Sequence, residues 1–199
     1  MLEVWWSALH ASTSRSSVSG CLYSSWRSLT GDGEAAVTTE DTTMRDIEAA
    51  MALQHSGDLD GARQRFTVIW EAIASDGDPF HRCVLAHYMA DLQPDPRDEL
   101  IWDLRALDAA ASVTDQRAKQ HDSSLAVRGF YPSLHLNLAA DYHKLADTTQ
   151  ARTHLAQAQE HLDALNDDAY GHGIRSAIRR LADQLADEST SAPMDVGMK

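Results

Sequence analysis

The segment from Thr43 to Trp70 constrains the fold most strongly, because it reads as two amphipathic helices joined by a tight turn. In its second half Ala62, Phe66 and Ile69 are spaced four and three residues apart, which places them on one face of a helix. The turn sequence HSGD, residues 55–58, contains the glycine typical of such connections. One hairpin cannot bury its apolar stripe alone, so we predict that similar hairpins stack on it.

Helix start signals recur along the chain and predict two further hairpins. The dipeptides Asp78-Pro79 and Asp95-Pro96 each place a capping acid before a proline at the first helical position. Tyr131-Pro132 opens a fifth helix, and Asp147 with Gln150 has capping-box spacing at the start of a sixth. The polar stretch 112–129 is longer than a repeat turn, so it is expected to be an insertion with a short helix after Thr114.

The first 43 residues differ in composition from the rest, being rich in Ser, Thr and Gly without a sustained helical or strand period. We predict a disordered N-terminal tail or an over-extended gene start. Met44 directly follows Thr43, a plausible N-cap with Asp46 as its capping-box acid. Two alternatives stay open: a docking arm that carries Trp5 and Trp6, or a targeting segment.

A single helix is predicted to close the stack at its C-terminal end. Its apolar face consists of Ile174, Ile178, Leu181 and Leu185. An unpaired terminal helix of this kind covers the exposed core of a repeat array. The sequence Gly171-His172-Gly173 is interpreted as a flexible entry to this helix. The helical repeat domain is therefore expected over 44–187, followed by a disordered tail over 188–199.

Composition excludes several classes of function. The formal net charge is −13, and three of the 17 basic residues are lysines, so a direct nucleic-acid binder is not expected. Nowhere in the sequence is there an apolar run of the about 20 residues that a membrane helix needs. Cys21 and Cys83 lie far apart without metal-ligand spacing, which favours a reduced, cytoplasmic protein.

Acidic side chains are expected to form a solvated face that would attract a basic partner electrostatically. Those assigned to this face are Asp58, Asp60, Asp103, Asp108, Asp163, Asp167 and Asp168. Asp58, Asp78, Asp95 and Asp147 already have a structural task as helix caps, so none of these four is predicted to act as a general acid.

Aligned on their turns, the three hairpins resemble tetratricopeptide (TPR) repeats, whose unit of about 34 residues has small residues where helices pack. The third hairpin carries the motif on Leu138, Ala139, Tyr142, Ala151, Leu155 and Ala158, and the first on Ala49, Ala50, Leu53, Gly57, Ala62, Phe66 and Ile69. In the second, Ala86, Met89 and Trp102 fit, but Asp98 and Arg105 stand where alanines belong. The chain is similar to small TPR proteins of actinobacteria.

The resemblance implies an all-α fold: a right-handed α-solenoid of about three TPR-like hairpins with a C-terminal capping helix. It also implies a non-enzymatic adaptor whose concave groove, lined by the first helix of each hairpin, binds a peptide or a partner helix. The groove positions carried over are Ile47, Met51, Gln54, His55, Phe80, Cys83, His87, Leu136, Asn137, His143 and Lys144. Their mixed lining disfavours a peptide carboxylate and favours an apolar or mixed segment.

Histidine supports an alternative function, because nine of the ten histidines lie beyond residue 43. A metal- or pH-responsive sensor or a small enzyme would use His55, His87 and His143, with Cys83 as a further ligand or nucleophile. The histidine pairs lack HExxH or i, i+4 spacing, so we predict no metal, no cofactor and no catalytic residue. Self-association through an exposed end of the short array is a third possibility.

Overall fold

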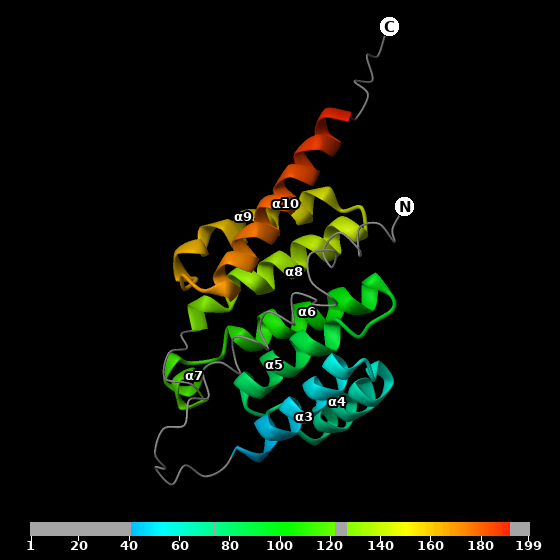
Figure 1. Cartoon of the computed structure of the whole chain (residues 1–199), viewed down its shortest axis with the longest axis vertical. Coiled ribbons are helices and arrows are strands. Elements are labelled where there is room, and N and C mark those ends of the chain that lie inside the picture. Colours follow the sequence, from blue (N-terminus) through cyan, green and yellow to red (C-terminus); the bar gives the residue numbers. More distant parts are fainter. Residues whose placement is uncertain (1–40, 74, 122–126, 192–199) are drawn as a thin grey trace, which may run out of the picture.

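The structure is a computed structural model that describes residues 41–73, 75–121 and 127–191, and these residues form an all-α fold (Figure 1). The helices are α3 (Thr42–Ser56), α4 (Leu59–Ile73), α5 (Pro79–Ala90), α6 (Pro96–Ala110), α7 (Asp115–His121), α8 (Tyr131–Lys144), α9 (Thr148–Glu160) and α10 (Ala169–Ser191). Short 3₁₀ turns, η1 (Val127–Gly129) and η2 (Leu162–Ala164), precede α8 and follow α9. The predicted helices are all present, including the short one after Thr114. The proposed arm with Trp5 and Trp6 lies outside the described residues.

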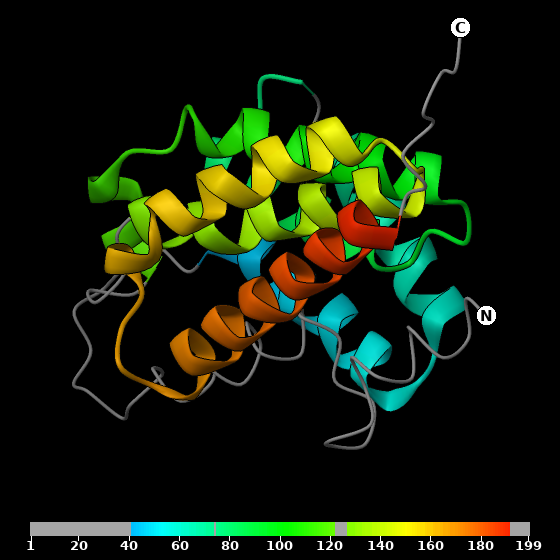
Figure 2. The same ribbon diagram turned by 90° about the horizontal axis from the view of Figure 1, so that it is seen from above.

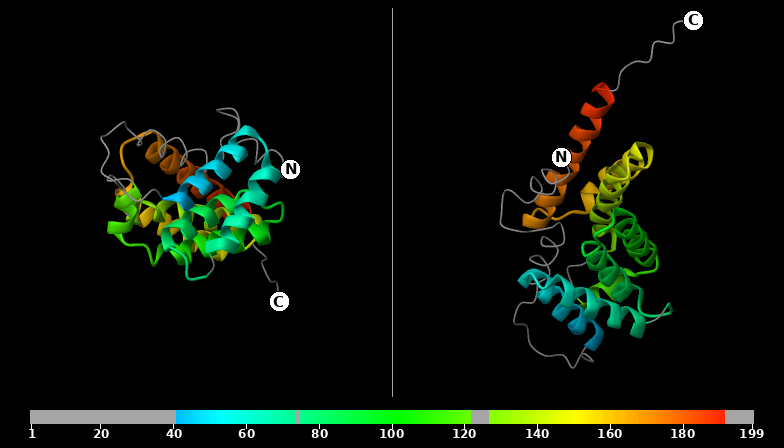
Figure 3. Two further views of the ribbon diagram at one scale, coloured as in Figure 1. Left: turned by 90° about the horizontal axis from the view of Figure 1, so that it is seen from below. Right: turned by 90° about the vertical axis from the view of Figure 1, so that its right-hand side faces the viewer.

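The helices pack as three consecutive hairpins, α3–α4, α5–α6 and α8–α9, followed by α10. Helix α6 packs against α8 and thereby joins the second hairpin to the third. Figure 3 shows α3–α4 at one end of the molecule and α10 at the other. In Figure 2, α10 crosses the α8–α9 pair obliquely, and it packs against both helices of that pair. The predicted cap of the third hairpin is therefore a single long helix.

Aspartates begin most of the helices, as the sequence predicts. The carboxylates of Asp78, Asp95 and Asp147 accept hydrogen bonds from backbone N–H groups in the first turns of α5, α6 and α9. The predicted N-cap of α3 is wrong, because Asp41 rather than Thr43 accepts from the Met44 N–H at 3.0 Å. The folded part therefore begins upstream of Met44.

The first and third hairpins turn through a residue in the left-handed region. Gly57 has a φ of 91°, a conformation that glycine adopts without steric cost. In the third hairpin Ala146 takes the corresponding place with a φ of 61°, where its Cβ makes the conformation unfavourable by roughly 1–2 kcal/mol. The same turn geometry is thus reached with two different residues.

The start of α10 differs from the prediction. Gly171-His172-Gly173 lies inside the helix, which begins at Ala169. The Gly171 N–H donates to Asp168 Oδ1 at 2.7 Å, and a Cβ at Gly171 would lie 2.1 Å from the Asn166 carbonyl oxygen. Glycine is therefore required at this position by close backbone approach, and the predicted flexible entry is a tight helix start.

Helix α7 is fixed to the body of the protein by Arg117. Its guanidinium donates to Asp41 at 2.8 Å and also to Asp78, so that one cation joins the N-caps of α3 and α5. The same guanidinium lies 4.9 Å from the centre of the Phe80 ring. His81 Nε2 contacts the shared Asp41 carboxylate at 2.8 Å. The insertion thus packs where the first two hairpins begin.

Candidate functional site

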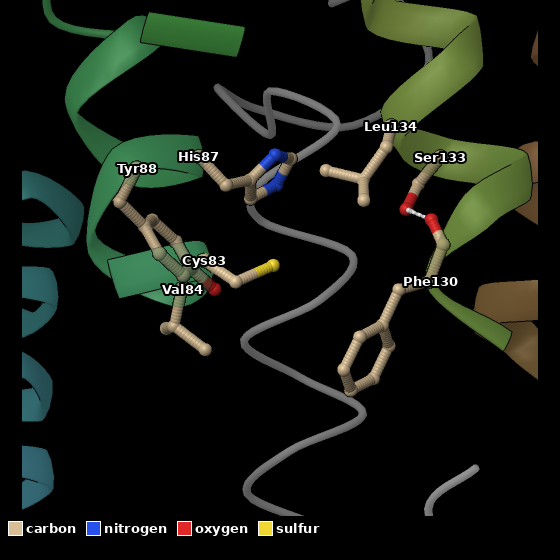
Figure 4. A pocket seen from close by; sticks show the side chains of 7 residues that line it. All are labelled: Cys83, Val84, His87, Tyr88, Phe130, Ser133 and Leu134. Atoms are coloured by element: carbon tan, nitrogen blue, oxygen red, sulfur yellow. Dashed lines mark hydrogen bonds between the residues drawn. The ribbon is translucent and has the colours of Figure 1, made fainter. Parts of the chain in front are cut away.

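A cavity lies between α5 and the start of α8 (Figure 4). Its empty volume is about 350 Å³, part of which is open to solvent. The residues that line it are Cys83, Val84, His87, Tyr88, Phe130, Ser133 and Leu134. These walls are predominantly apolar, and the Ser133 hydroxyl is already used, because it donates to the Phe130 carbonyl at 2.9 Å. Cys83 and His87 are the two predicted groove residues that the cavity brings together.

His87 supplies the polar part of the cavity. Its side chain is buried, and Asn137 Nδ2 lies 3.3 Å from its Nδ1. When the asparagine amide donates to Nδ1, the neutral ring carries its proton on Nε2. Burial lowers the pKa of His87 to about 4, which keeps the ring neutral near pH 7. Nε2 is buried without a hydrogen-bond partner, and Figure 4 shows a ring nitrogen directed into the cavity.

Cys83 is a poor nucleophile in this setting. Its thiol is buried, and desolvation, followed by the charge of Asp103, raises its pKa to about 12. A thiol with such a pKa holds its proton at physiological pH, whereas nucleophilic attack requires the thiolate. The cavity wall therefore uses Cys83 as a small apolar residue.

Behind His87 lies a buried polar cluster that sequence reasoning missed. Asn137 Nδ2 reaches Asp103 Oδ1 at 3.4 Å, and His87 Nδ1 lies 3.9 Å from the same oxygen. Asp103 is only 1% exposed, so its assignment to a solvated acidic face is wrong. A charged side chain at this depth requires hydrogen-bonding or ionic partners.

The partner of Asp103 is Asp141 of α8, which is also 1% exposed. The two carboxyl groups lie close enough that each influences the pKa of the other. Lys144 is the cation of the cluster, with its Nζ 2.6 Å from Glu99 Oε1 and 3.2 Å from Asp141 Oδ1. Burial raises the pKa of Asp141 to about 7, assisted by the charge of Glu99. Burial and the neighbouring Asp141 raise the pKa of Asp103 well above its usual value.

The remaining predicted groove residues are spread over several environments. Ile47, Met51 and Phe80 are buried in the core around α3 to α6, and Leu136 is buried in the core around α8 to α10. Gln54 is half-buried and its Oε1 has no hydrogen-bond partner. These positions therefore contribute packing more than an open binding surface.

The predicted composite site of His55, His87 and His143 does not assemble. His55 Nδ1 lies 2.7 Å from the Met51 carbonyl oxygen, whereas His143 Nε2 lies 2.7 Å from Glu188 of α10. Among the described residues, no group of three or more His, Cys, Asp or Glu side chains is arranged to hold a metal ion.

A different set of histidines meets on the face shared by α8 and α9. The Nδ1 atoms of His135 and His154 are 3.1 Å apart, and the ring of His161 lies 6.2 Å from that of His135. Tyr131 and Tyr142 pack at the two ends of this row. Burial and the neighbouring imidazoles lower the pKa of His135 to about 4. The spacing of histidines within one helix does not predict this row, because His135 belongs to α8 and His154 to α9, and the two meet only when these helices pair.

Comparison with family models, curated proteins and solved structures yields no match for this chain. None of the described helices combines the length and apolarity that crossing a bilayer requires. The cavity and the polar cluster behind it are therefore the observations on which a function can be argued.

Proposed function

We propose that the chain is a non-enzymatic interaction module built as a right-handed solenoid of three TPR-like hairpins closed by α10. In this proposal the first helices of the hairpins, α3, α5 and α8, form a concave surface that receives a segment of a partner protein. The cavity between α5 and α8, with the unpartnered His87 Nε2, carries the proposal. Clefts with apolar walls and few directed polar groups are typical of binding sites.

The packing of the motif residues supports the repeat part of this proposal. In the first hairpin Ala50, Ala62 and Phe66 are fully buried, and in the third Ala139 and Ala151 are fully buried at the matching positions. Small residues at these positions let paired helices approach closely, which is what the TPR pattern requires.

The walls of the cavity define the chemistry of the segment it would take. Val84, Phe130 and Leu134 favour an apolar side chain, and the Nε2–H of His87 favours one uncharged acceptor such as a peptide carbonyl. A carboxylate is disfavoured, because none of the lining residues is a cation. The net charge of −13 favours basic residues on either side of the apolar anchor.

Selection of peptides from a random library tests this proposal, followed by titration of a selected peptide with fluorescence anisotropy. Val84→Phe fills the cavity from α5 and is expected to weaken binding at least about tenfold. Val68→Phe is the matched control, because Val68 is 65% exposed on α4 and the same substitution there should leave affinity unchanged. His87→Leu is expected to weaken binding of any peptide whose carbonyl meets Nε2.

Aspartate substitutions at Met51, Phe80 or Leu136 would not test the site, because these residues are core residues whose replacement would unfold the protein. Circular dichroism should therefore confirm that both valine variants are folded. Sedimentation at two protein concentrations separates peptide binding from self-association. Equal affinity of wild type and Val84→Phe would contradict the assignment of the cavity.

A further inference from the structure

The buried carboxyl pair of Asp103 and Asp141 joins two different hairpins. Asp103 belongs to α6 in the second hairpin, and Asp141 belongs to α8 in the third. Both residues are 1% exposed, so water contributes little to the hydration of either carboxyl. Two ionised carboxylates that act on each other at such depth would repel each other strongly.

The available donors do not satisfy two ionised groups. Asn137 Nδ2 reaches Asp103 Oδ1 at 3.4 Å, and Lys144 Nζ reaches Asp141 Oδ1 at 3.2 Å. Asp141 Oδ2 is buried and has no donor from another residue within hydrogen-bonding distance. An ionised carboxylate only accepts hydrogen bonds, so a carboxyl oxygen that is buried without a donor favours a proton on one member of the pair. The geometry thus calls for a shared proton at this point.

The charged groups around the pair also favour a proton on one of the two carboxyl groups. On α6 the pair meets Glu99, and from the end of α5 the charge of Asp91 acts on Asp103. On α8 the facing groups are the amide of Asn137 and the ammonium of Lys144, and Lys144 is shared with Glu99. His87 of α5 is neutral near pH 7, as shown above. One cation among these acidic groups cannot compensate all of them when every carboxyl is ionised.

We propose that one proton shared by Asp103 and Asp141 holds the α5–α6 hairpin against the α8–α9 hairpin, and that its loss as the pH rises loosens this interface. The device is a pH-sensitive contact inside the repeat stack. It does not depend on the proposed binding function, because it involves the packing of α6 on α8 rather than the cavity.

The direction of the pH dependence follows from the raised pKa values. In the unfolded chain both aspartates have a pKa near 3.9. In the folded protein the pKa of Asp141 is about 7, and that of Asp103 is also raised. The stabilisation is therefore complete below about pH 4 and is lost as the pH rises through the folded values. Neutral His87 acts in the opposite sense, because its lowered pKa disfavours folding as the pH falls.

Infrared spectroscopy of the full chain tests for the proton directly. At about pH 6.5 ordinary aspartates are ionised, so a carbonyl stretch of a protonated carboxylic acid reports an exceptional group. The wild type is expected to show this band and to lose it on titration to about pH 9. Asp141→Asn and Asp103→Asn should each remove it. Asp108→Asn, an exposed change on α6, should retain it, and absence of the band in the wild type would overturn the proposal.

Urea unfolding from about pH 5 to about pH 9 tests the consequence. In Asp141→Asn the amide can donate to Asp103 and so replaces the proton. The unfolding equilibrium constant of the wild type, divided by that of this variant, should rise by up to about tenfold per pH unit between about pH 5 and about pH 7, where the folded pair keeps a proton that the unfolded chain has lost. The ratio should level off at higher pH, once the folded pair has lost its proton. Asp103→Asn provides the same comparison if Asp141→Asn does not fold. Parallel pH profiles of wild type and folded variants would contradict a shared proton.

Hydrogen exchange locates the effect within the molecule. At about pH 8 the amides of α6 and α8 should exchange faster in the wild type than in Asp141→Asn, after correction for intrinsic exchange rates. The amides of α3 and α4 should be nearly unaffected. Equal acceleration in all three hairpins would show a global loss of stability and would overturn the assignment to this interface.

Discussion

The second helices of the first two hairpins, α4 and α6, begin in the same way but differ in two of the side chains that they direct inward. These side chains are apolar in α4 and acidic in α6. Each of these helices, α4 and α6, follows a capping aspartate, Asp58 or Asp95. The fourth and eighth residues after this aspartate are Ala62 and Phe66 in α4, but Glu99 and Asp103 in α6. The third hairpin agrees with the first, with Ala151 and Leu155 after Asp147. The second hairpin thus has two acids where its neighbours have apolar core residues.

The two hairpins share their helical geometry but are stabilised by different interactions. Phe66 packs inside its own hairpin and against Tyr88, which is 6.3 Å away between ring centres. Asp103 and Glu99 have their hydrogen-bond partners outside their own hairpin, in Asn137 and Lys144 of α8. The acids therefore tie the second hairpin to the third through directed polar contacts, whereas the first hairpin depends on apolar burial.

The largest effect is expected at the apolar side of this comparison. Phe66→Ala removes a fully buried ring and leaves a cavity, which should lower the free energy of unfolding by about 3–5 kcal/mol. Urea denaturation measures this change. Val68→Ala, which alters a 65% exposed side chain on the same helix, should change stability by less than about 0.5 kcal/mol. A small loss for Phe66→Ala would mean that the first hairpin is not held by apolar packing.

Removal of the Lys144 ammonium tests the polar contacts between the second and third hairpins. Lys144→Met leaves Glu99 and Asp141 without their shared partner, and breaking a partly buried pair of this kind should cost about 2–4 kcal/mol near pH 7. The loss should be smaller at about pH 5, where Asp141 holds a proton in the folded protein. Denaturation at both pH values measures the difference, and Lys119→Met on the exposed face of α7 serves as control. A loss independent of pH would separate Lys144 from the carboxyl pair.

A smaller change in stability is expected when the aspartate that caps α3 is removed. Asp41→Ala removes the cap of α3 and its contacts with His81 and Arg117, so a loss of about 1–2 kcal/mol is expected. Asp46, the acid that the sequence suggested for this cap, makes a surface ion pair with Arg65, and Asp46→Ala should cost at most about 1 kcal/mol. Thermal or urea denaturation compares the two. A larger effect at Asp46 would restore the cap predicted at Thr43.

The smallest expected effect concerns the turn of the third hairpin. Ala146→Gly relieves the left-handed conformation that Gly57 adopts without cost in the first hairpin, and it should raise stability by up to about 1 kcal/mol. Ala156→Gly, at an exposed position within α9, should instead lower stability by about 1 kcal/mol. Urea denaturation resolves the opposite signs. Destabilisation by Ala146→Gly would show that the turn is not strained.

The second hairpin keeps the helical spacing of the other two hairpins when positions are counted from its capping aspartate. Counting from the capping Asp95 places Glu99, not Asp98, at the position of the first small residue. Likewise Ala106 is fully buried, whereas Arg105 is exposed and lies 4.3 Å from the centre of the Trp102 ring. Glu99 and Ala106 therefore lie seven residues apart, as Ala62 and Ile69 do in α4.

The positions of the helices could be predicted from the sequence, because capping aspartates, prolines at first turns and apolar spacing act within a few residues. It also placed Cys83 and His87 on one helix face, four residues apart. The burial of Asp103 beside Asn137 and Asp141 became visible only in the folded structure, since these partners lie more than 30 residues away along the chain. The burial of a polar side chain depends on the helices packed around it, and local patterns do not contain that information.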